Sequence, residues 1–385
     1  MKFKLFFTIF CSFLYLSADA QQTINASIIN GGIQRDYILY VPASYTGTTA
    51  VPLLLNFHGL TSNATQQMFY GDFRSIADTA GFIIVHPEGT LDNNGDTHFN
   101  VGWGASTVDD VAFSSALIDF ISAQYNINQD RVYSTGMSNG GFMSFKLACE
   151  LSDRIAGIAS VTGSILPFTL SSCNALHSTP IMQIHGTNDG SVPYNGGAGW
   201  TEPIGSLVDY WASFNNCTVT PVIENMPNIS IIDGSTVEKI SYLNGYNCTE
   251  VIHFKITNGG HTWPGSVIPL SATNYDINAS IEVWNFLSKY DINGLISCGN
   301  VGVKEETLNS DLFVYPNPAE DKLQIDGLDN ITDLRKLVIT DLSGAVLISA
   351  KNADNGIDIA ELSCGFYLVH IEHATGRRSI KFTKQ

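Results

Sequence analysis

The chain has 385 residues, a formal net charge of −17 and only 14% charged side chains, while 44% of its residues are hydrophobic. A chain this acidic repels phosphate groups, so it is a poor candidate for binding nucleic acid or an anionic membrane surface. Its length suffices for one large domain or two unequal ones.

The N-terminus has the three parts of a secretory signal peptide. Lys2 and Lys4 form a basic region, residues 5–16 are apolar, and Ala18-Asp-Ala20 is a small-x-small cleavage site. The apolar run is short for a bilayer span, although an uncleaved membrane anchor is the alternative. We expect residues 1–20 to be removed and the mature protein to have no membrane span.

Short apolar runs alternate with amphipathic segments up to about residue 290. Strands are predicted at 35–41, 51–57, 82–85, 132–135, 155–161, 181–184 and 251–256. Helices are predicted at 68–80, 109–125, 142–148, 205–214 and 279–289. This alternation is typical of the α/β class, in which helices cover both faces of a mostly parallel sheet. Ligands of such sheets bind beyond the carboxyl ends of the strands.

One segment joins a strand, a sharp turn and a helix. The turn is Gly136-Met-Ser138-Asn-Gly140, a G-x-S-x-G motif that exposes the serine hydroxyl and leaves no room for Cβ atoms two residues to either side. We interpret Ser138 as a nucleophile and the backbone N–H of Asn139 as an oxyanion donor at the helix start. The alternative is a glycine-rich turn packed against a neighbour.

A serine nucleophile needs a histidine as base, which on this fold follows in the chain. His253 lies within the predicted strand 251–256, where its side chain faces one side of the sheet. His261 follows a glycine-rich loop past that strand and can reach over the sheet edge. We therefore predict His261 as the base.

The carboxylate that orients this histidine should lie between Ser138 and His261 in the sequence. Asp153 and Asp209 fall on or near helices, and Asp233 lies in a polar turn. Asp189 follows the strand 181–184 directly, so we predict Asp189 as the acid. A turn-forming aspartate is the alternative.

The loop after the strand 51–57 should supply the second oxyanion donor. Its sequence is His58-Gly59-Leu60, and we choose the backbone N–H of Leu60, an ordinary turn being the alternative. His58, His86 and His185 all follow strands, which raises a zinc hydrolase as a rival. The compact ligand spacing of such enzymes is missing from the sequence, so we expect neither a metal nor another cofactor.

Six cysteines follow the predicted cleavage site, and in an oxidising compartment some should pair. Cys217 ends a helix-like segment and Cys248 precedes a strand, so that this pair is plausible; Cys149 with Cys173 is the other. There is no C-x-x-C sequence, so neither a zinc ribbon nor a redox motif is indicated.

The composition changes near residue 299. Residues 299–311 are polar and read as a linker. Residues 312–385 contain short alternating runs without a helical pattern, which predicts a small β-sandwich that carries no catalytic constellation.

Residues 23–290 resemble the secreted polyhydroxybutyrate depolymerase and feruloyl or acetylxylan esterase group of α/β-hydrolases. The motifs are His58-Gly59, Val108-Asp-Asp-Val111, Gly136-Met-Ser-Asn-Gly-Gly141, His185-Gly-Thr-Asn-Asp-Gly-Ser-Val-Pro-Tyr194 and Gly259-Gly-His-Thr-Trp-Pro-Gly265. The resemblance implies Ser138, Asp189 and His261 as a triad, Trp263 in the acyl pocket and both cysteine pairs as disulfides. We also assign substrate contact to His58. Many members carry cysteine where this chain has Leu60, and a double-cysteine element before Val108 is absent.

Residues 312–385 are similar to a sorting domain of the type IX secretion system. The likeness rests on Tyr315-Pro-Asn-Pro-Ala319, Asp341-Leu-Ser-Gly344, Gly365-Phe-Tyr-Leu and the basic end 381–384. It implies that the secretion machinery is a partner, that the protein crosses the outer membrane and that the tail is removed. A carbohydrate-binding or adhesive module is the alternative.

Together these features predict a secreted, monomeric serine carboxylic-ester hydrolase that acts through an acyl-enzyme on Ser138. Its substrate would be a polyester, as in polyhydroxybutyrate depolymerases, or a feruloyl or acetylxylan ester of plant cell walls. The rival from another class is a secreted binding protein on an inactive hydrolase fold, but no triad residue is lost.

Overall fold

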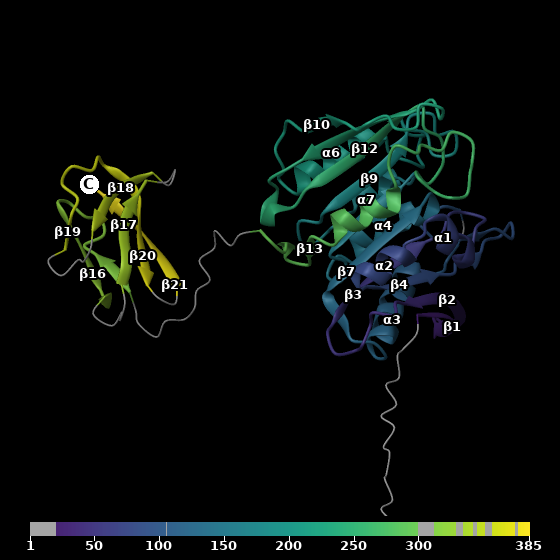
Figure 1. The fold of residues 1–385 in the computed structure, drawn as a ribbon, viewed down its shortest axis with the longest axis horizontal. Coiled ribbons are helices and arrows are strands. Elements are labelled where there is room, and N and C mark those ends of the chain that lie inside the picture. The colour runs from purple at the N-terminus through teal and green to yellow at the C-terminus, as the bar shows by residue number, and fades with distance from the viewer. Residues whose placement is uncertain are drawn as a thin grey trace, which may run out of the picture. The chain divides into compact units, whose positions relative to one another are not determined.

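A computed structural model of the chain describes residues 21–104, 106–298, 312–328, 334–341, 345–350, 356–373 and 376–385. The predicted signal peptide, residues 1–20, and the predicted linker, residues 299–311, lie outside the described residues. Contacts divide the chain into two compact units, Met1–Cys298 and Gly299–Gln385 (Figure 1). No helix among the described residues is long and apolar enough to cross a membrane.

The first unit is built on a ten-stranded sheet in the order β1-β2-β4-β3-β7-β8-β9-β12-β11-β10. The six strands from β4 to β12 run parallel, and antiparallel strands flank them on both sides. The strands are β1 Gln22–Asn30, β2 Ile33–Val41, β3 Val51–Phe57, β4 Ile83–Pro87, β7 Ile127–Met137, β8 Gly157–Val161, β9 Ile181–Gly186, β10 Val222–Asn225, β11 Thr236–Tyr242 and β12 Val251–Thr257.

Helices cover both faces of this sheet. Because side chains alternate along a strand, Leu53 and Leu55 of β3 join one apolar cluster and Leu54 joins the other. Helices α3, α4 and α6 contribute to the first cluster, and α2 and α7 to the second. The helices are α1 Ala64–Tyr70, α2 Arg74–Ala80, α3 Asp110–Ser122, α4 Asn139–Glu150, α5 Pro167–Ser171, α6 Ile204–Phe214 and α7 Ala279–Leu287, with a one-turn 3-10 helix at Tyr246–Cys248.

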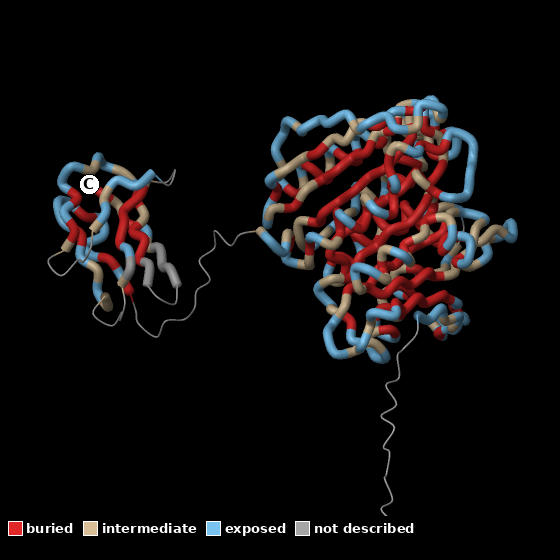
Figure 2. Tube along the Cα trace, in the orientation of Figure 1, coloured by how far each residue is buried: buried red, intermediate tan, exposed pale blue. Residues whose placement is uncertain are grey.

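This arrangement is the α/β-hydrolase fold, which confirms the predicted fold class. The central strands are buried on both faces, as their continuous apolar sequences indicated (Figure 2). Two short hairpins, β5–β6 (Thr90–Leu91 and Thr97–His98) and β13–β14 (Tyr290–Asp291 and Gly294–Leu295), complete the first unit.

The helix predicted at 68–80 is wrong as a single element, because the chain turns at Gly71. A Cβ on Gly71 would lie 2.7 Å from Gln67 Nε2 and 3.1 Å from the Trp263 ring, so a side chain has no room there. The carbonyl of Gly71 accepts a hydrogen bond from Asn56 Nδ2 at 2.9 Å, which ties the break to β3. The result is two helices, α1 and α2.

The second unit consists of two small sheets, β15-β16-β19 and β18-β17-β20-β21. Their apolar residues form one core that includes Leu323, Ile339, Val369 and Phe382. The unit is all-β, as its short alternating runs predicted. Its strands are β15 Phe313–Tyr315, β16 Lys322–Asp326, β17 Leu334–Thr340, β18 Val346–Ala350, β19 Ile357–Asp358, β20 Gly365–His373 and β21 Gly376–Lys384.

Candidate active site

Ser138 stands at the carboxyl end of the central strand β7, directly before α4. Its backbone has φ 54° and ψ −120°, a strained conformation for a residue with a side chain. The N–H of Ser138 donates to the Val161 carbonyl at 2.9 Å, and its own carbonyl accepts from Phe142 N at 3.0 Å. The serine is therefore held at the sharp corner between a strand and a helix.

The glycines around this corner are required by close packing. A Cβ on Gly136 would lie 2.6 Å from the Gly140 carbonyl carbon and 2.7 Å from the Phe57 carbonyl oxygen. A Cβ on Gly140 would overlap the same Phe57 oxygen. The backbone thus makes the bend that the G-x-S-x-G pattern predicted.

Asp189 and His261 are paired at the same edge of the sheet. Asp189 follows β9 and His261 follows β12, the strand next to β9. Asp189 Oδ2 accepts a hydrogen bond from His261 Nδ1 at 2.7 Å, and the His261 side chain is 21% exposed while that of Asp189 is buried. Since Nδ1 carries this proton, Nε2 of the neutral ring is free to accept another.

The carboxylate of Asp189 is fully engaged. Oδ1 accepts backbone hydrogen bonds from Ser191 and Val192, each at 2.8 Å. Oδ2 also lies 3.3 Å from Nε2 of His185. Burial by itself raises the pKa of the Asp189 carboxyl, but hydrogen bonds from His185 and His261 outweigh it and hold that pKa below its usual value. Asp189 is therefore ionised and fixed in position.

His185 was not identified from the sequence as a neighbour of Asp189. Its Nδ1 lies 2.9 Å from Gln183 Nε2, an amide nitrogen that also donates to the Gly163 carbonyl at 2.9 Å. Because Gln183 is the donor, Nδ1 accepts and Nε2 carries the proton of the neutral ring. That proton points to the Val192 carbonyl at 2.9 Å and to Asp189, so His185 supports the carboxylate from behind.

The other residues weighed for these roles lie elsewhere. His253 is buried within β12, where it contacts Tyr194 OH at 2.9 Å and the Gln183 carbonyl at 3.1 Å. Burial lowers the pKa of His253 to about 4. Asp209 is exposed on α6 and accepts from a tyrosine, and Asp233 accepts from the turn at Ser235.

Two backbone N–H groups near Ser138 remain unused. Among the residues that the structure describes, neither the N–H of Asn139 nor that of Leu60 has a hydrogen-bond partner. A Cβ on Gly59 would lie 3.4 Å from Ser138 Cβ, so the loop that carries Leu60 touches the serine. A hydrogen bond between Ser138 and His261 is not among those of the described residues, and in unliganded hydrolases this contact is often long.

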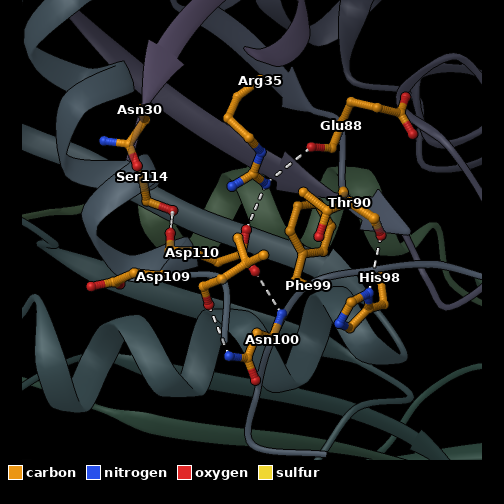
Figure 3. Close-up of polar contacts among 12 residues, drawn as sticks. Asn30, Arg35, Glu88, Thr90, His98, Phe99, Asn100, Asp109, Asp110 and Ser114 are labelled. Atoms are coloured by element: carbon orange, nitrogen blue, oxygen red, sulfur yellow. Dashed lines mark hydrogen bonds and ion pairs between the residues drawn. The ribbon is translucent and has the colours of Figure 1, made fainter. Parts of the chain in front are cut away.

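A buried network that sequence reasoning missed holds Asn139 in place. The Asn139 side chain accepts from Phe99 N at 2.8 Å and donates to the Phe99 carbonyl at 3.0 Å. The next residue, Asn100, donates its N–H to Asp110 Oδ2 at 2.6 Å, and Asp110 Oδ1 pairs with Arg35 at 2.6 Å (Figure 3). The loop beside the serine is thereby anchored to β2 and α3.

The same network explains the Val108-Asp-Asp-Val111 motif. Asp109 caps α3 by accepting from Ala112 N at 2.8 Å, whereas Asp110 is buried in the ion pair with Arg35. The guanidinium also stacks 3.8 Å from the centre of the Phe113 ring. The two aspartates therefore have separate structural tasks, which their adjacency in the sequence did not distinguish.

His58 and Trp263, for which substrate contact is predicted, are both buried in this structure. The His58 side chain is fully buried, its Nδ1 donates to the Gly59 carbonyl at 2.7 Å and its Nε2 accepts from Gly89 N at 2.9 Å. Burial lowers the pKa of His58 to about 4, so the ring is neutral. Trp263 is 1% exposed in the core, with Nε1 bonded to Ser280 Oγ at 3.1 Å. Both residues support site loops from inside.

One of the two predicted disulfides needs correction. Cys149 pairs with Cys173 as predicted, but Cys248 pairs with Cys298 and not with Cys217. The hairpin β13–β14 packs on the turn that carries Cys248, where a Cβ on Gly294 would lie 2.5 Å from Asn247, and so brings Cys298 to it. Burial raises the pKa of the free Cys217 thiol to about 11.

Comparisons with known proteins show which families this chain resembles. Residues 35–189 match the family described as Esterase PHB depolymerase, and residues 313–385 match the Secretion system C-terminal sorting domain. The chain is 28% identical to a bifunctional acetylxylan esterase/xylanase of Neocallimastix patriciarum over 73% of this chain and 37% of that protein. It is 31% identical to feruloyl esterase B of Piromyces equi over 59% of this chain and 42% of that protein.

The chain thus spans about two fifths of the length of these two relatives. Among solved structures, an acetyl xylan esterase from Aspergillus awamori aligns with a TM-score of 0.48 and 14% identity, over 70% of this chain and 99% of that one. The resemblances stated from the sequence are confirmed. Residues 35–189 are thus similar to the Esterase PHB depolymerase family, and residues 313–385 are similar to the secretion system C-terminal sorting domain.

Proposed function

We propose that this protein is a secreted serine hydrolase of carboxylic esters, with Ser138 as nucleophile, His261 as base and Asp189 as the acid that orients it. The observation that carries the proposal is the 2.7 Å contact between Asp189 Oδ2 and His261 Nδ1. It lies at the sheet edge where Ser138 occupies a strained corner between β7 and α4.

In this mechanism Ser138 Oγ attacks the ester carbonyl carbon while His261 Nε2 takes the hydroxyl proton. Asp189 stabilises the imidazolium that forms. The carbonyl oxygen becomes an oxyanion, which the N–H groups of Asn139 and Leu60 stabilise. The C–O bond to the alcohol breaks, and the alcohol leaves with the proton from His261.

Water completes the cycle on the acyl-enzyme. His261 removes a proton from the water as it attacks the acyl carbon, and the second tetrahedral intermediate collapses to a carboxylic acid. Ser138 recovers its proton from His261. This sequence balances atoms and charge with the chain's own side chains and requires no metal or organic cofactor. Among the described residues, no three His, Cys, Asp or Glu side chains form a cluster suited to a metal ion.

The substrate we propose first is a polyester, hydrolysed as by a polyhydroxybutyrate depolymerase. The match of residues 35–189 to the Esterase PHB depolymerase family supports it. Feruloyl or acetylxylan esters are the second candidate, because two of the similar proteins are named as esterases of those classes. Hydrolysis of p-nitrophenyl acetate, methyl ferulate and a hydroxybutyrate oligomer by the same preparation would rank them.

The variant Ser138→Ala tests the mechanism. It should lower kcat on every hydrolysed ester by a factor on the order of 10⁶, because the nucleophile is lost while the corner backbone remains. A circular dichroism spectrum should match that of the wild type, and a chelator should leave the wild type unaffected. Substantial turnover by folded Ser138→Ala would disprove the serine mechanism.

We also propose that the sorting domain directs export through type IX secretion machinery across the outer membrane and is then removed. The match of residues 313–385 supports this. Mass spectrometry of the mature protein from a host with that machinery is the test. A mature protein that ends at Gln385 would contradict removal and favour a retained adhesive module.

A further inference from the structure

Two surface loops beside the candidate active site carry a cluster of solvent-exposed aliphatic side chains. The first loop, residues 226–232, exposes Ile229, Ile231 and Ile232, and Ile232 is 94% exposed. The second, residues 264–275, begins three residues after His261 and exposes Val267, Ile268 and Leu270. A soluble protein seldom exposes so many neighbouring aliphatic residues without a partner for them.

Hydrogen bonds join the two loops into one surface, which we call the aliphatic surface. Ser230 N donates to Asp276 Oδ1 at 2.9 Å, and Tyr275 N donates to Asp233 Oδ2 at 3.0 Å. Asn274 Nδ2 donates to Ser235 Oγ at 2.8 Å. Each loop is thereby fixed by the polar residues at the base of the other, and the aliphatic side chains are held outward on a braced backbone.

This surface is uncharged although the chain as a whole carries a net charge of −17. Neither residues 226–232 nor residues 264–275 contain an aspartate, glutamate, lysine or arginine. The carboxylates of Asp233 and Asp276, just outside the two loops, accept the hydrogen bonds that join them. An uncharged aliphatic surface on an acidic protein fits an uncharged partner.

A pocket lies beside the aliphatic surface, and two residues of the second loop line it. It has a volume of about 520 Å³ and lies between α1, which contributes Phe69 and Tyr70, and the second loop, which contributes Ile268 and Leu270. This volume is in the range of pockets that bind small molecules or one segment of a polymer.

Both walls of this pocket are tied to segments of the site. On the α1 side, Ser62 N donates to the Gly59 carbonyl at 3.1 Å, and Gly59 is the residue that touches Ser138. On the other side, Gly260 N donates to the Ala272 carbonyl at 3.0 Å, one residue before His261. A segment of a polymer substrate held in the pocket is therefore adjacent to the loops that carry Leu60 and His261.

From these observations we propose that the aliphatic surface adsorbs the face of a solid aliphatic polyester, one segment of which enters the pocket. Isoleucine, valine and leucine cannot pair with sugar hydroxyls, and burying those hydroxyls unpaired costs free energy. Methyl and methylene groups of a polyester lose no hydrogen bonds when they are buried against that surface. The inference rests on the proposed ester hydrolysis and names the substrate class for the same site.

The experiment compares two triple serine variants of the full chain. The loop variant combines Ile229→Ser, Ile231→Ser and Ile232→Ser. The matched control combines Val219→Ser, Val222→Ser and Ile223→Ser, which removes three exposed aliphatic side chains at 94%, 57% and 59% exposure. These control residues belong to β10 and its entry and lie toward the start of β10, whereas the first loop of the aliphatic surface follows the end of that strand. Val267→Ser, at a position that is 88% exposed and does not line the pocket, tests the second loop separately.

Adsorption is measured on poly(3-hydroxybutyrate) particles in a Ser138→Ala background, and hydrolysis in the wild-type background. We expect the loop variants to adsorb at least about tenfold more weakly and to release product from particles correspondingly slowly. Their kcat/KM on p-nitrophenyl butyrate should stay within about twofold of wild type, because no catalytic atom changes. The control variant should behave as wild type in each assay.

Equal adsorption by the loop variants and the control would overturn the proposal. Binding to neutral phosphatidylcholine vesicles in place of polyester would assign the surface to lipid, and binding to xylan to polysaccharide. A dimer found by sedimentation and lost in the loop variants would assign it to a second copy of the chain. If the wild type hydrolysed no soluble ester, the proposed function would fail, whatever the Ser138→Ala background adsorbs.

Discussion

The two units of this chain differ in what they bury. The catalytic unit buries ionisable side chains near one sheet edge, and Arg35, Asp110, Asp189 and His185 each have polar partners there. In the C-terminal unit the described buried residues are mainly aliphatic and aromatic, and its buried ionisable side chains, His370 and Lys384, contact Thr340 Oγ1 at 2.9 Å and the Gln385 carbonyl at 2.7 Å. Burying charge costs free energy unless it is paired, so a fold that does so is holding groups in fixed positions. The buried carboxylates of the first unit, Asp110 and Asp189, have no counterpart among the described buried residues of the second.

After loss of the nucleophile, the largest expected effect comes from breaking the buried Asp189–His261 pair of the catalytic unit. Asp189→Asn should lower kcat by a factor on the order of 10⁴, because an amide favours the wrong tautomer of His261. Asp209→Asn is the matched control, since Asp209 is exposed and binds only Tyr242 OH at 2.9 Å in the described residues. Steady-state kinetics on a soluble ester measures both. Similar losses in both variants would show that Asp189 has no special role.

The features that could be predicted from the sequence are those that local backbone geometry determines. The corner at Ser138 follows from Gly136 and Gly140, because a Cβ at either position would clash with atoms close in space. The Asp189–His261 pair follows from strand order, because both residues come just after neighbouring parallel strands. Such features depend on short segments and on the handedness of the fold, which the pattern of apolar residues reveals.

Features that depend on distant side chains could not be predicted in this way. The local sequence of His58 does not show that two backbone groups, one of them at Gly89, engage both of its ring nitrogens. Arg35 and Asp110 are 75 residues apart, and nothing in either local sequence announces the pair. Cys298 reaches Cys248 only because the hairpin at 290–295 folds back on the turn before it.

The second prediction concerns the Cys248–Cys298 disulfide, whose removal should have the next largest effect. Cys298→Ser should destabilise the catalytic unit by about 4 kcal/mol, the chain-entropy value for opening a loop of 50 residues. Cys217→Ser should have a much smaller effect because Cys217 is unpaired. Urea unfolding followed by tryptophan fluorescence measures both. Peptide mapping without reduction should yield the Cys248–Cys298 link, and a Cys217–Cys248 peptide would refute it.

The third prediction concerns the pH dependence that the buried His253 gives to the stability of the catalytic unit. Burial lowers the pKa of His253 to about 4, below its value of about 6.5 in the unfolded chain. Between these values the unfolded state binds the extra proton, so stability is present above pH 6.5 and is lost as pH falls toward 4. One such histidine costs about 2 kcal/mol between pH 7 and pH 5.

The variant His253→Gln removes this one titration and keeps a side-chain amide in the same place. Its unfolding free energy should therefore fall by about 2 kcal/mol less than that of the wild type between pH 7 and pH 5. Urea titrations at the two pH values give the difference. His58, with a pKa also lowered to about 4 by burial, should keep part of the pH dependence in the variant. Identical pH dependence in both proteins would mean that His253 is not buried neutral.

The smallest expected effect tests whether the two units are independent in chemistry. Deleting residues 300–385 should leave kcat/KM on a soluble ester within about a factor of two, because separately folded domains contribute little to each other's sites. The residues proposed for catalysis all lie before Cys298, and the chain divides there into its two compact units. Rates on p-nitrophenyl butyrate for the full and shortened chains provide the measurement.

The same deletion should abolish export, although it leaves kcat/KM nearly unchanged. In a host with type IX machinery the shortened chain should stay in the periplasm, since residues 313–385 match the sorting domain. Adsorption to polyester particles should persist, because the aliphatic surface belongs to residues 226–275 of the catalytic unit. If the shortened chain left the cell but lost adsorption, the tail would be a binding module and the aliphatic surface would not be sufficient for docking. The deletion therefore tests the export signal and the aliphatic surface separately.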